Sequence, residues 1–449
     1  REDLMLRIQQ CGNGKKIIEK PICVFIDNLG PNINTKYHEY GAVISADESV
    51  IIFTSRREGS TGGKIDPVLN EYYEDLYIST KNADGTWAAA QNMGENVNTK
   101  DHDAVSAISA DGQRIIIYRG DSGMGDLFEC VLEGSEWSKP EDLGNKINTK
   151  NFQEPSACYS PDGNTLYFVS EAPGGLGKHD IYLSKRDDKG KWGPAENLGP
   201  TINTKYKEDG IYLHPDGKTL YFGSEGHTSM GDMDIFKSVF DATTNKWSTP
   251  ENLGYPVNTA DQDAFFVISA NGRHGYYMSS AHQDNLGLRD LYMITFLGPE
   301  KKMVLNNEDN LLASAAAPVK EIVIAPVVIV KEAQLTILKG VISDYLTNDL
   351  LEAEIEIVDN QANKVIATFK SNSKTGKFLV SLPAGKNYGI AVKKDQYLFH
   401  SENFDIPNTA AFQEVEKNIA LKKLSVGSKI VLRNIFFDLD KATLRVEST

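Results

Sequence analysis

The sequence of 449 residues has little cysteine and no long apolar run. Its four cysteines are Cys11, Cys23, Cys130 and Cys158. They form no CxxC pair and have no histidine cluster at zinc-ligand spacing, which argues against a zinc site, while one incidental disulfide stays open. We expect buried, apolar cysteine side chains. The longest apolar run, VIAPVVIV at 323–330, is far shorter than the roughly 20 residues of a membrane span.

Basic residues are also scarce, with 47 Lys and Arg against 62 Asp and Glu and a net charge of −15. Nucleic-acid binding needs a basic surface, so this composition argues against nucleic acid as a partner. The imbalance is local, because residues 1–296 hold 28 basic and 43 acidic side chains while residues 297–449 hold 19 of each. We therefore expect a partner guided by charge to the N-terminal two thirds to be basic.

A repeated phrase dominates the first 300 residues, and its copies start 50 to 64 residues apart. The five copies are LGPNINTK from Leu29, MGENVNTK from Met93, LGNKINTK from Leu143, LGPTINTK from Leu198 and LGYPVNTA from Leu253. Each is followed by an acid, a turn such as SPDG at 160–163, an apolar run, a Gly-rich loop, and an Asp with two apolar residues. The D-G and N-G pairs suit tight turns between strands. Each unit thus predicts four short strands, and units of this period indicate a β-propeller.

The five units predict five blades over residues 21–297. The fifth unit lacks the tryptophan segment that follows the other four at Trp87, Trp137, Trp192 and Trp247. The run PICVFIDNL at 21–29 can supply the missing outer strand, which would close the ring and remove its exposed edges. An open solenoid would instead leave both end units uncapped.

The segment Ser160–Ser170, with its SPDG turn and the strand TLYFVS, resembles the PD40 or TolB-like repeat family. The resemblance covers about residues 21–297. It implies a propeller fold but no particular activity.

The first repeated acid of each unit stands just before the strand expected to line the central channel. These acids are Glu39, Asp103, Glu154, Glu208 and Asp263. A ring of carboxylates can bind a cation or a cationic partner, and two carboxylates can serve as acid and base of a five-bladed glycosidase. Catalytic carboxyl groups need different environments, however, whereas here the same residue type returns in every unit. We therefore expect structural acids that accept hydrogen bonds within their own blade.

The second repeated acid of each unit precedes an apolar strand and is also expected to be structural, in a turn or an inter-blade hydrogen bond. These acids are Asp75, Asp126, Asp180, Asp234 and Asp290. No Ser/His/Asp or Cys/His constellation stands out in the sequence. No catalytic residue, cofactor site or metal site is predicted, and we expect that the protein is not an enzyme.

Residues 298–334 are Ala-rich and punctuated by proline, which predicts a linker before a smaller domain at 335–424. Alternation at Ala353–Val358 and Lys377–Leu382, with short turns between runs, predicts a small antiparallel β-sandwich. The segments KGVI at 339–342, TGKF at 375–378 and LPAGKNYGI at 382–390 resemble the carboxypeptidase regulatory-like, or transthyretin-like, domain. In that family such modules are spacers or interaction modules.

Residues 425–449 resemble the opening of an OmpA-like peptidoglycan-binding domain, which has an α/β fold. The matching positions are Asn434, Phe436, Phe437, Asp438, Asp440 and Leu444. Only a truncated start is present, since such a domain needs roughly 100 residues. In that family the residues that bind the diaminopimelate of peptidoglycan lie in later segments, so none can be assigned here.

Residues 1–20 include DLMLRIQQ at 3–10, which predicts the tail of a preceding helical domain such as a TPR domain. The order of helix tail, propeller, sandwich and OmpA-like start resembles the PorE-type proteins associated with the type IX secretion system of Bacteroidetes. We therefore expect a piece of a longer tethered protein, cut at both ends.

These resemblances imply a non-enzymatic scaffold in the periplasm, at the outer membrane and cell wall, that links an envelope machine to peptidoglycan. The propeller and the sandwich would then be protein-interaction modules. Two alternatives are a carbohydrate-active enzyme on a five-bladed propeller and a TolB-like accessory protein that binds a peptide in its channel. The sequence does not identify the partner, the propeller face it meets, the oligomeric state or a lipid anchor.

Overall fold

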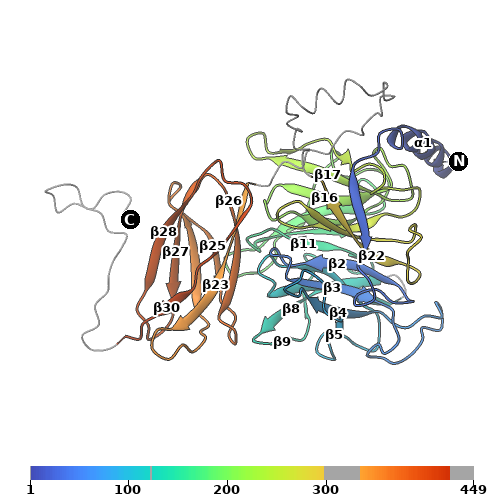
Figure 1. Cartoon of the computed structure of the whole chain (residues 1–449). Helices are drawn as coiled ribbons and strands as arrows, with labels where there is room; N and C mark the ends of the chain where they lie inside the picture. The colour runs from blue at the N-terminus through green and yellow to red at the C-terminus, as the bar shows by residue number, and fades with distance from the viewer. Residues whose placement is uncertain (1, 122–123, 298–333, 425–449) are drawn as a thin grey trace, which may run out of the picture.

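The structure is a computed structural model that describes residues 2–121, 124–297 and 334–424. Over these residues the chain is mainly β, with one helix, α1 (Glu2–Ile17), and seven sheets. Five sheets belong to the N-terminal part and two to the C-terminal part, and the two parts lie side by side (Figure 1). Within the described ranges, no helix has the length and apolar character needed to cross a membrane.

The five N-terminal sheets are built mostly from strands that follow one another in the chain. The first contains β2 (Glu39–Ile44), β3 (Val50–Ser55), β4 (Asp75–Thr80) and β5 (Gln91–Asn92). The second contains β6 (Asp103–Ile108), β7 (Arg114–Asp121), β8 (Met124–Glu133), β9 (Glu136–Trp137) and β10 (Glu141–Asp142). The third contains β11 (Ala157–Tyr159), β12 (Thr165–Ser170), β13 (Asp180–Lys185) and β14 (Glu196–Asn197). The fourth contains β15 (Glu208–Leu213), β16 (Thr219–Ser224), β17 (Asp234–Asp241), β18 (Lys246–Trp247) and β19 (Glu251–Asn252). The fifth contains β20 (Ala264–Ile268), β21 (His274–Ser279), β22 (Asp290–Phe296) and β1 (Val24–Asn28).

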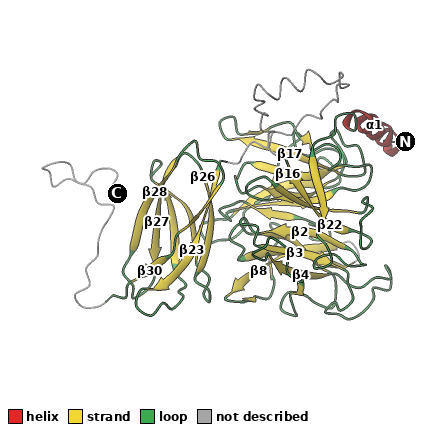
Figure 2. Ribbon diagram, viewed as in Figure 1, coloured by secondary structure: helices red, strands yellow, loops and turns green. Residues whose placement is uncertain are grey.

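The innermost strands of these sheets form a closed ring. Strands β2, β6, β11, β15 and β20 contact one another in this order, and β20 contacts β2 again. Apolar side chains fill the space between neighbouring sheets, as where Phe222 and Phe236 of the fourth pack with Val169 and Ile181 of the third. Such a ring of radially packed sheets is a β-propeller (Figure 2). The predicted mainly β chain with a β-propeller is therefore confirmed.

The fifth sheet joins the two ends of the ring. Its outer strand β1 pairs antiparallel with β22, with Val24 opposite Phe296 and Asn28 opposite Tyr292. A strand from the N-terminal end thus completes a sheet whose other strands come from residues 264–296. The ring is therefore closed by hydrogen bonds between β1 and β22, which lie at opposite ends of the propeller sequence.

The tight turns between the first two strands use a repeated serine motif in four of the five propeller sheets, and the fourth sheet has His214 in place of the serine. In the third sheet, Ser160 Oγ donates to Asp162 Oδ1 at 2.5 Å and accepts from the Thr165 N–H at 2.8 Å. Gly163 then takes a φ of +68°, a region that favours glycine. The first sheet has Glu48 at the equivalent position, with a φ of +57°.

The unusual backbone at Glu48 is accompanied by contacts between the first and fifth sheets. The Glu48 carboxylate is 2.9 Å from His274 Nδ1 and also accepts from the Tyr276 hydroxyl, both on β21. Lys81 Nζ, from the first sheet, is 3.1 Å from the same carboxylate. A non-glycine residue with positive φ is costly, so these contacts offset local strain.

The C-terminal part consists of two packed sheets, here called the sandwich. One contains β26 (Lys377–Pro383), β23 (Leu335–Asp344), β29 (Gln413–Glu416) and β30 (Ile419–Leu421). The other contains β25 (Lys364–Lys370), β24 (Glu354–Asp359), β27 (Lys386–Lys393) and β28 (His400–Ile406). Residues such as Leu338, Phe378, Ile357 and Tyr388 form the core between them.

Two expectations for the sandwich are wrong in detail. Strands β29 and β30 pair parallel with β23, because the chain reaches them from β28 in the other sheet rather than through a hairpin. The predicted alternation holds in β24 but not in β26, where Leu379 and Ser381 are buried as well as their neighbours. Leu379 is buried because its outward side packs against the propeller.

The cysteines also differ from expectation. Cys130 and Cys158 are buried, but Cys11 is exposed and Cys23 is half-buried, and all four are free thiols. Gln10 and Asn13 of helix α1 contact the propeller, whereas Cys11, which lies between them in the sequence, is exposed to solvent.

Candidate functional site

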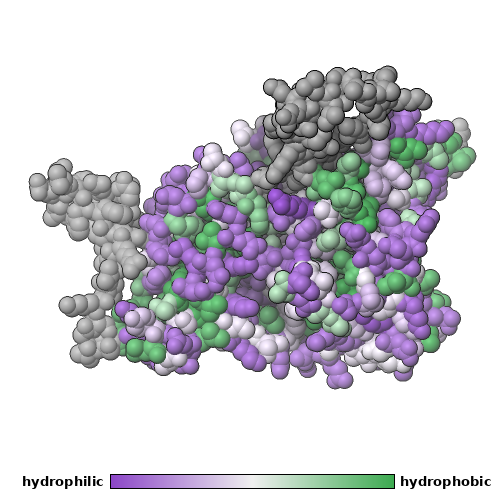
Figure 3. Space-filling view, in the orientation of Figure 1, coloured by the Kyte–Doolittle hydropathy of each residue, from purple (hydrophilic) through white to green (hydrophobic). Residues whose placement is uncertain are grey.

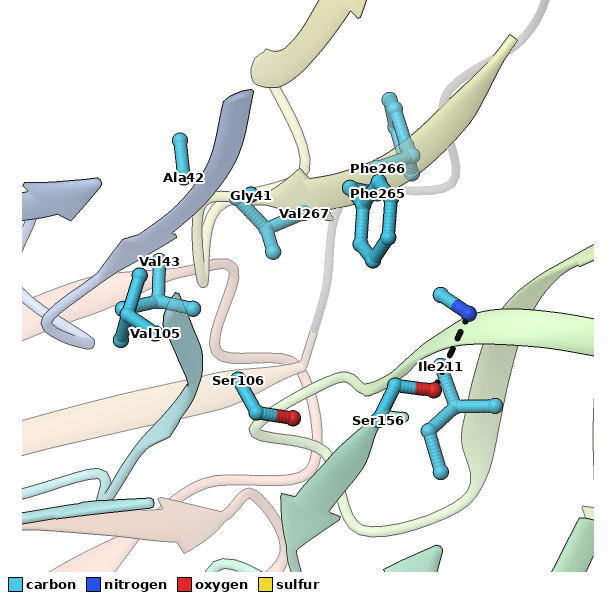
Figure 4. Close-up of a pocket in the computed structure, with 11 residues that line it drawn as sticks. Gly41, Ala42, Val43, Val105, Ser106, Ser156, Ile211, Phe265, Phe266 and Val267 are labelled. Carbon is cyan, nitrogen blue, oxygen red and sulfur yellow. Dashed lines mark hydrogen bonds between the residues drawn. The ribbon is translucent and has the colours of Figure 1, made fainter. Parts of the chain in front are cut away.

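The centre of the propeller is narrow where the innermost strands approach one another. A pocket there is lined by Gly41, Ala42, Val43, Val105, Ser106, Ser156, Gly210, Ile211, Phe265, Phe266 and Val267 (Figure 4). Its free space is about 10 Å³, which is about what one water molecule needs. None of the ten repeated acids is among the lining residues.

Phe265 helps to close this channel. Its φ is +55°, and the equivalent residues of the first and fourth innermost strands are Gly41 (φ +61°) and Gly210 (φ +60°). A Cβ on Gly210 would lie 2.9 Å from the Phe265 nitrogen, so glycine is needed there for close packing. The aromatic ring of Phe265 points toward the space between the lining residues (Figure 4).

The first repeated acids are fully buried and bind groups of their own sheet. All five, Glu39, Asp103, Glu154, Glu208 and Asp263, have no exposed surface. Glu208 accepts from Thr204 N at 2.9 Å, Thr204 Oγ1 at 2.7 Å and Ser224 Oγ at 2.7 Å. Glu39 and Glu154 have the same three kinds of donor. A structural role for these acids remains our interpretation, and these contacts support it.

The two aspartates of this set differ from the three glutamates. Asp103 accepts from Arg119 Nε at 2.5 Å, where the other sheets have a serine. Asp263 accepts from Thr259 N at 2.5 Å through Oδ2, but its Oδ1 has no hydrogen-bond partner. The shorter side chain does not reach Ser279, which stands where Ser224 stands in the fourth sheet.

Burial changes the protonation of some of these acids. Desolvation raises the pKa of Glu208 to about 7 and that of Asp263 to about 8. Raised pKa values are typical of general acids, but they also occur in structural carboxyl groups. Desolvation is the largest cause of both raised pKa values, and nearby carboxylates add to it, Asp180 for Glu208 and Asp234 for Asp263.

The second repeated acids tie a loop to the outermost strand of their sheet. Asp180 accepts from Leu176 N at 2.5 Å, Gly177 N at 2.9 Å and Asn197 Nδ2 at 2.8 Å. The equivalent donors to the side chains of Asp75, Asp234 and Asp290 include Asn92, Asn252 and Asn28. The second sheet has Asp142 in place of this asparagine, and desolvation followed by the charge of Asp142 raises the pKa of Asp126.

The asparagine of each repeated phrase was not singled out from the sequence, yet it makes the most regular contact of the propeller. Asn203 donates to Ile181 O at 3.0 Å and accepts from Ile181 N at 2.7 Å, which joins the phrase to the third strand of the preceding sheet. The same pair of bonds is made by Asn34, Asn98, Asn148 and Asn258. The recurrence of this asparagine in all five copies of the phrase is the sequence signal that could have identified it.

A cluster of charged groups lies between the first and second sheets. His102 is 3.0 Å from Asp66 Oδ2 and 3.2 Å from Glu74 Oε2, and Arg56 also pairs with Glu74. Burial opposes ionisation of Glu74, but the hydrogen bond from His102 and the charge of Arg56 lower its pKa to about 2. These carboxylates are paired rather than open to a ligand. Among the residues that the structure describes, no group of three His, Cys, Asp or Glu is arranged to hold a metal ion.

The predicted OmpA-like motif lies outside the described residues. It comprises Asn434, Phe436, Phe437, Asp438 and Asp440.

No protein-family model and no curated protein sequence matches the chain. Among solved structures, TolB from Acinetobacter baumannii is 15% identical with a TM-score of 0.35, over 58% of this chain and 55% of that one. A glycoside hydrolase is 10% identical with a TM-score of 0.44, over 66% of this chain and 97% of that one. A β-xylosidase/α-arabinofuranosidase from a compost microbial metagenome is 12% identical with a TM-score of 0.40, over 62% and 96%. The match spans about half the length of the Acinetobacter TolB. With these TM-scores below 0.5, the similarities carry no argument about function, which rests on the residues of this chain.

Proposed function

We propose that the protein is a non-enzymatic periplasmic scaffold that links an envelope machine, of the type IX secretion or gliding kind, to peptidoglycan. In this proposal the five sheets are the blades of a five-bladed PD40 or TolB-like propeller, and the sandwich is a carboxypeptidase regulatory-like domain. Residues 425–449 would begin an OmpA-like domain at the outer membrane and cell wall.

The observation that best supports binding rather than catalysis is the state of the ten repeated acids. A glycosidase needs two carboxyl groups about 5 to 9.5 Å apart that face an open sugar site. Here Glu154 and Glu208 are fully buried and accept hydrogen bonds from threonine and serine of their own sheets. The central pocket has room for about one water molecule, which also argues against a peptide threaded through the channel.

The scaffold proposal is tested by isolating the full-length protein from envelope extracts and identifying what co-purifies with it. We expect secretion or gliding components together with sedimentation on purified peptidoglycan sacculi. Sedimentation without such components would contradict the specific machine, and absence of sedimentation would contradict the link to the cell wall.

The non-enzymatic part is tested by a hydrolysis screen on polysaccharides with the wild-type chain and with Glu154→Gln and Glu208→Gln. We expect no turnover by any of the three proteins. Hydrolysis by the wild type that either substitution abolishes would establish an enzyme instead.

A further inference from the structure

One sheet of the sandwich is apolar on both faces. On β23, Leu338 points into the sandwich core, whereas Leu335 and Ile337 lie on the opposite face and are 1% and 0% exposed. On β26, Leu379 is likewise buried on that outer face. The outer face of a sheet in a two-layer sandwich is usually polar and solvated. The apolar outer face of this sheet is therefore typical of a surface that packs against another part of a protein.

Three turns of the propeller cover it. Leu335, Ile337 and Leu379 form one apolar cluster with Ala46 and Ala270, and Ala110 packs at its margin. These alanines hold the second position of the S-x-D/N turns in the first, fifth and second sheets. These three sheets are neighbours in the ring, since β2 contacts both β20 and β6.

The remaining two turns differ in sequence at the same position. The third and fourth sheets carry Pro161 and Pro215 there, of which Pro161 is half-buried and Pro215 is buried. Ala46 and Ala270 are 6% and 1% exposed, so the larger proline ring would not fit beneath the sandwich without moving it. The three turns that meet the sandwich in this cluster all carry alanine at this position.

Polar contacts surround the apolar cluster, as in a specific interface. Lys339 Nζ lies 3.5 Å from Asp47 Oδ2 and 2.7 Å from Glu414 Oε2. Asn372 Nδ2 donates to Gly134 O at 2.9 Å, and Gln113 Nε2 donates to Lys370 O at 3.2 Å. Figure 3 shows hydrophilic residues over most of the visible surface of both parts.

We propose that the outer face of the β26–β23–β29 sheet is a docking surface for alanine-bearing propeller turns, so that propeller and sandwich form one rigid unit. This goes beyond the scaffold proposal and does not depend on it. The sandwich is then held in one position against the propeller, and the small alanine of each contacted turn is what lets the sheet approach it.

The test separates docking from the covalent connection. A specific protease site is placed between residues 298 and 333 of the full chain, which is cleaved after folding and passed over a size-exclusion column at micromolar concentration. We expect the wild-type halves to elute together. In the triple variant Ala46→Pro, Ala110→Pro and Ala270→Pro, we expect them to separate, with binding weakened roughly tenfold or more.

The triple variant is chosen because the same turn already accepts proline at Pro161 and Pro215, so the propeller should fold. Its near-ultraviolet circular dichroism checks that it does. The matched control Pro161→Ala with Pro215→Ala changes the two turns outside the apolar cluster and should leave co-elution unchanged. Wild-type halves that separate, or variant halves that stay together with wild-type affinity, would each overturn the proposal.

Discussion

At the scale of single residues, the second sheet has one carboxylate where the other four sheets have a carboxamide. Asn197 shows the usual arrangement, because its Oδ1 accepts from Gly199 N and Asn203 while its Nδ2 donates to Asp180. Asp142 keeps the acceptor role, with Gly144 N at 2.5 Å and Asn148 Nδ2 at 2.9 Å. The Asp142 side chain has no N–H group to donate to Asp126, so two carboxyl groups are neighbours here. Burial, and then the charge of Asp142, raise the pKa of Asp126.

We predict that Asp142→Asn stabilises the protein by about 1 kcal/mol at neutral pH, because it supplies the missing donor and removes a like charge. Urea unfolding followed by circular dichroism measures this change. The matched control is Asn197→Asp, which builds the same carboxyl pair into the third sheet and should destabilise by a similar amount. A loss of stability in Asp142→Asn would show that the pair has another partner.

Asp263 gives a prediction about pH. Its pKa is raised by burial from 3.8 to about 8, so the folded state keeps a proton that the unfolded state has already released. This stabilising contribution is complete below about pH 4 and is lost as pH rises to about 8, at no more than about 1.4 kcal/mol per pH unit. The free energy of unfolding of Asp263→Asn should lack this fall. Parallel pH profiles of variant and wild type between pH 4 and 8 would contradict the assignment.

At this scale the sequence suggested a role for the repeated acids but did not identify the groups that donate hydrogen bonds to them. The repetition of Glu39 and its four equivalents was enough to suggest structural acids. Their donors could not be predicted, because Ser55 approaches Glu39 only once β2 and β3 pair, and the side chain of Thr35, four residues earlier, must turn back toward Glu39. The unpaired oxygen of Asp263 depends on a side chain one methylene shorter, and a repeat pattern does not weigh such a difference.

At the scale of elements, the seam between β1 and β22 is held by the same asparagine contact that joins the other sheets. Asn34 donates to Leu291 O at 2.8 Å, accepts from Leu291 N at 2.8 Å and also donates to Asn28 Oδ1 at 2.9 Å. Asn28 in turn donates to Asp290 Oδ2 at 2.7 Å. The closing strand is therefore fixed by side chains at its end as well as by its backbone ladder.

We predict that Asn34→Ala destabilises the protein by roughly 2–4 kcal/mol, since both buried backbone groups of Leu291 lose their partner. Amide hydrogen exchange should become faster in β1. The control Asn203→Ala removes the equivalent bonds from Ile181 at a place where the chain is continuous, so β1 should stay protected. Equal protection of β1 in both variants would show that the seam does not depend on Asn34.

Turn chemistry and alternation predicted the elements well where each strand has one buried face. Strand β24 follows its alternating pattern, with Ile355 and Ile357 in the core. Strand β26 does not, because Leu379 is buried by the propeller, which lies far away in sequence. The parallel pairing of β29 with β23 was also missed, because a short strand does not reveal from which end it enters its sheet.

At the scale of the whole molecule, the ring could be predicted from the spacing of one phrase, whereas the position of the sandwich could not. The contact between sandwich and propeller is reflected in the sequence by the apolar residues Leu335 and Ile337 on the outer face of β23. The sequence does not mark them as an outer face, because a short run of apolar residues does not show whether one or both faces of its strand are covered.

We predict that residues 334–424 alone associate with themselves, because removal of the propeller exposes Leu335, Ile337 and Leu379. Burial of each such side chain is worth about 1.5–3 kcal/mol, which favours another cover for the sheet. Analytical ultracentrifugation should show oligomers for this fragment and monomers for its variant Leu335→Thr, Ile337→Thr and Leu379→Thr, since threonine suits a solvated strand. A monomeric unsubstituted fragment would argue that the outer face tolerates water.

The seam in the fifth sheet also determines how the molecule would respond to tension. A pull on the N-terminal end would not reach β1 first, because α1 is anchored to the loop before β17 by Gln10 on Glu225 O and by Asn13 on Ser229 O. These few side-chain bonds would yield before the five paired residues of β1. Helix α1 would therefore detach first, and a single-molecule pulling trace would show a small extension step before the ring opens.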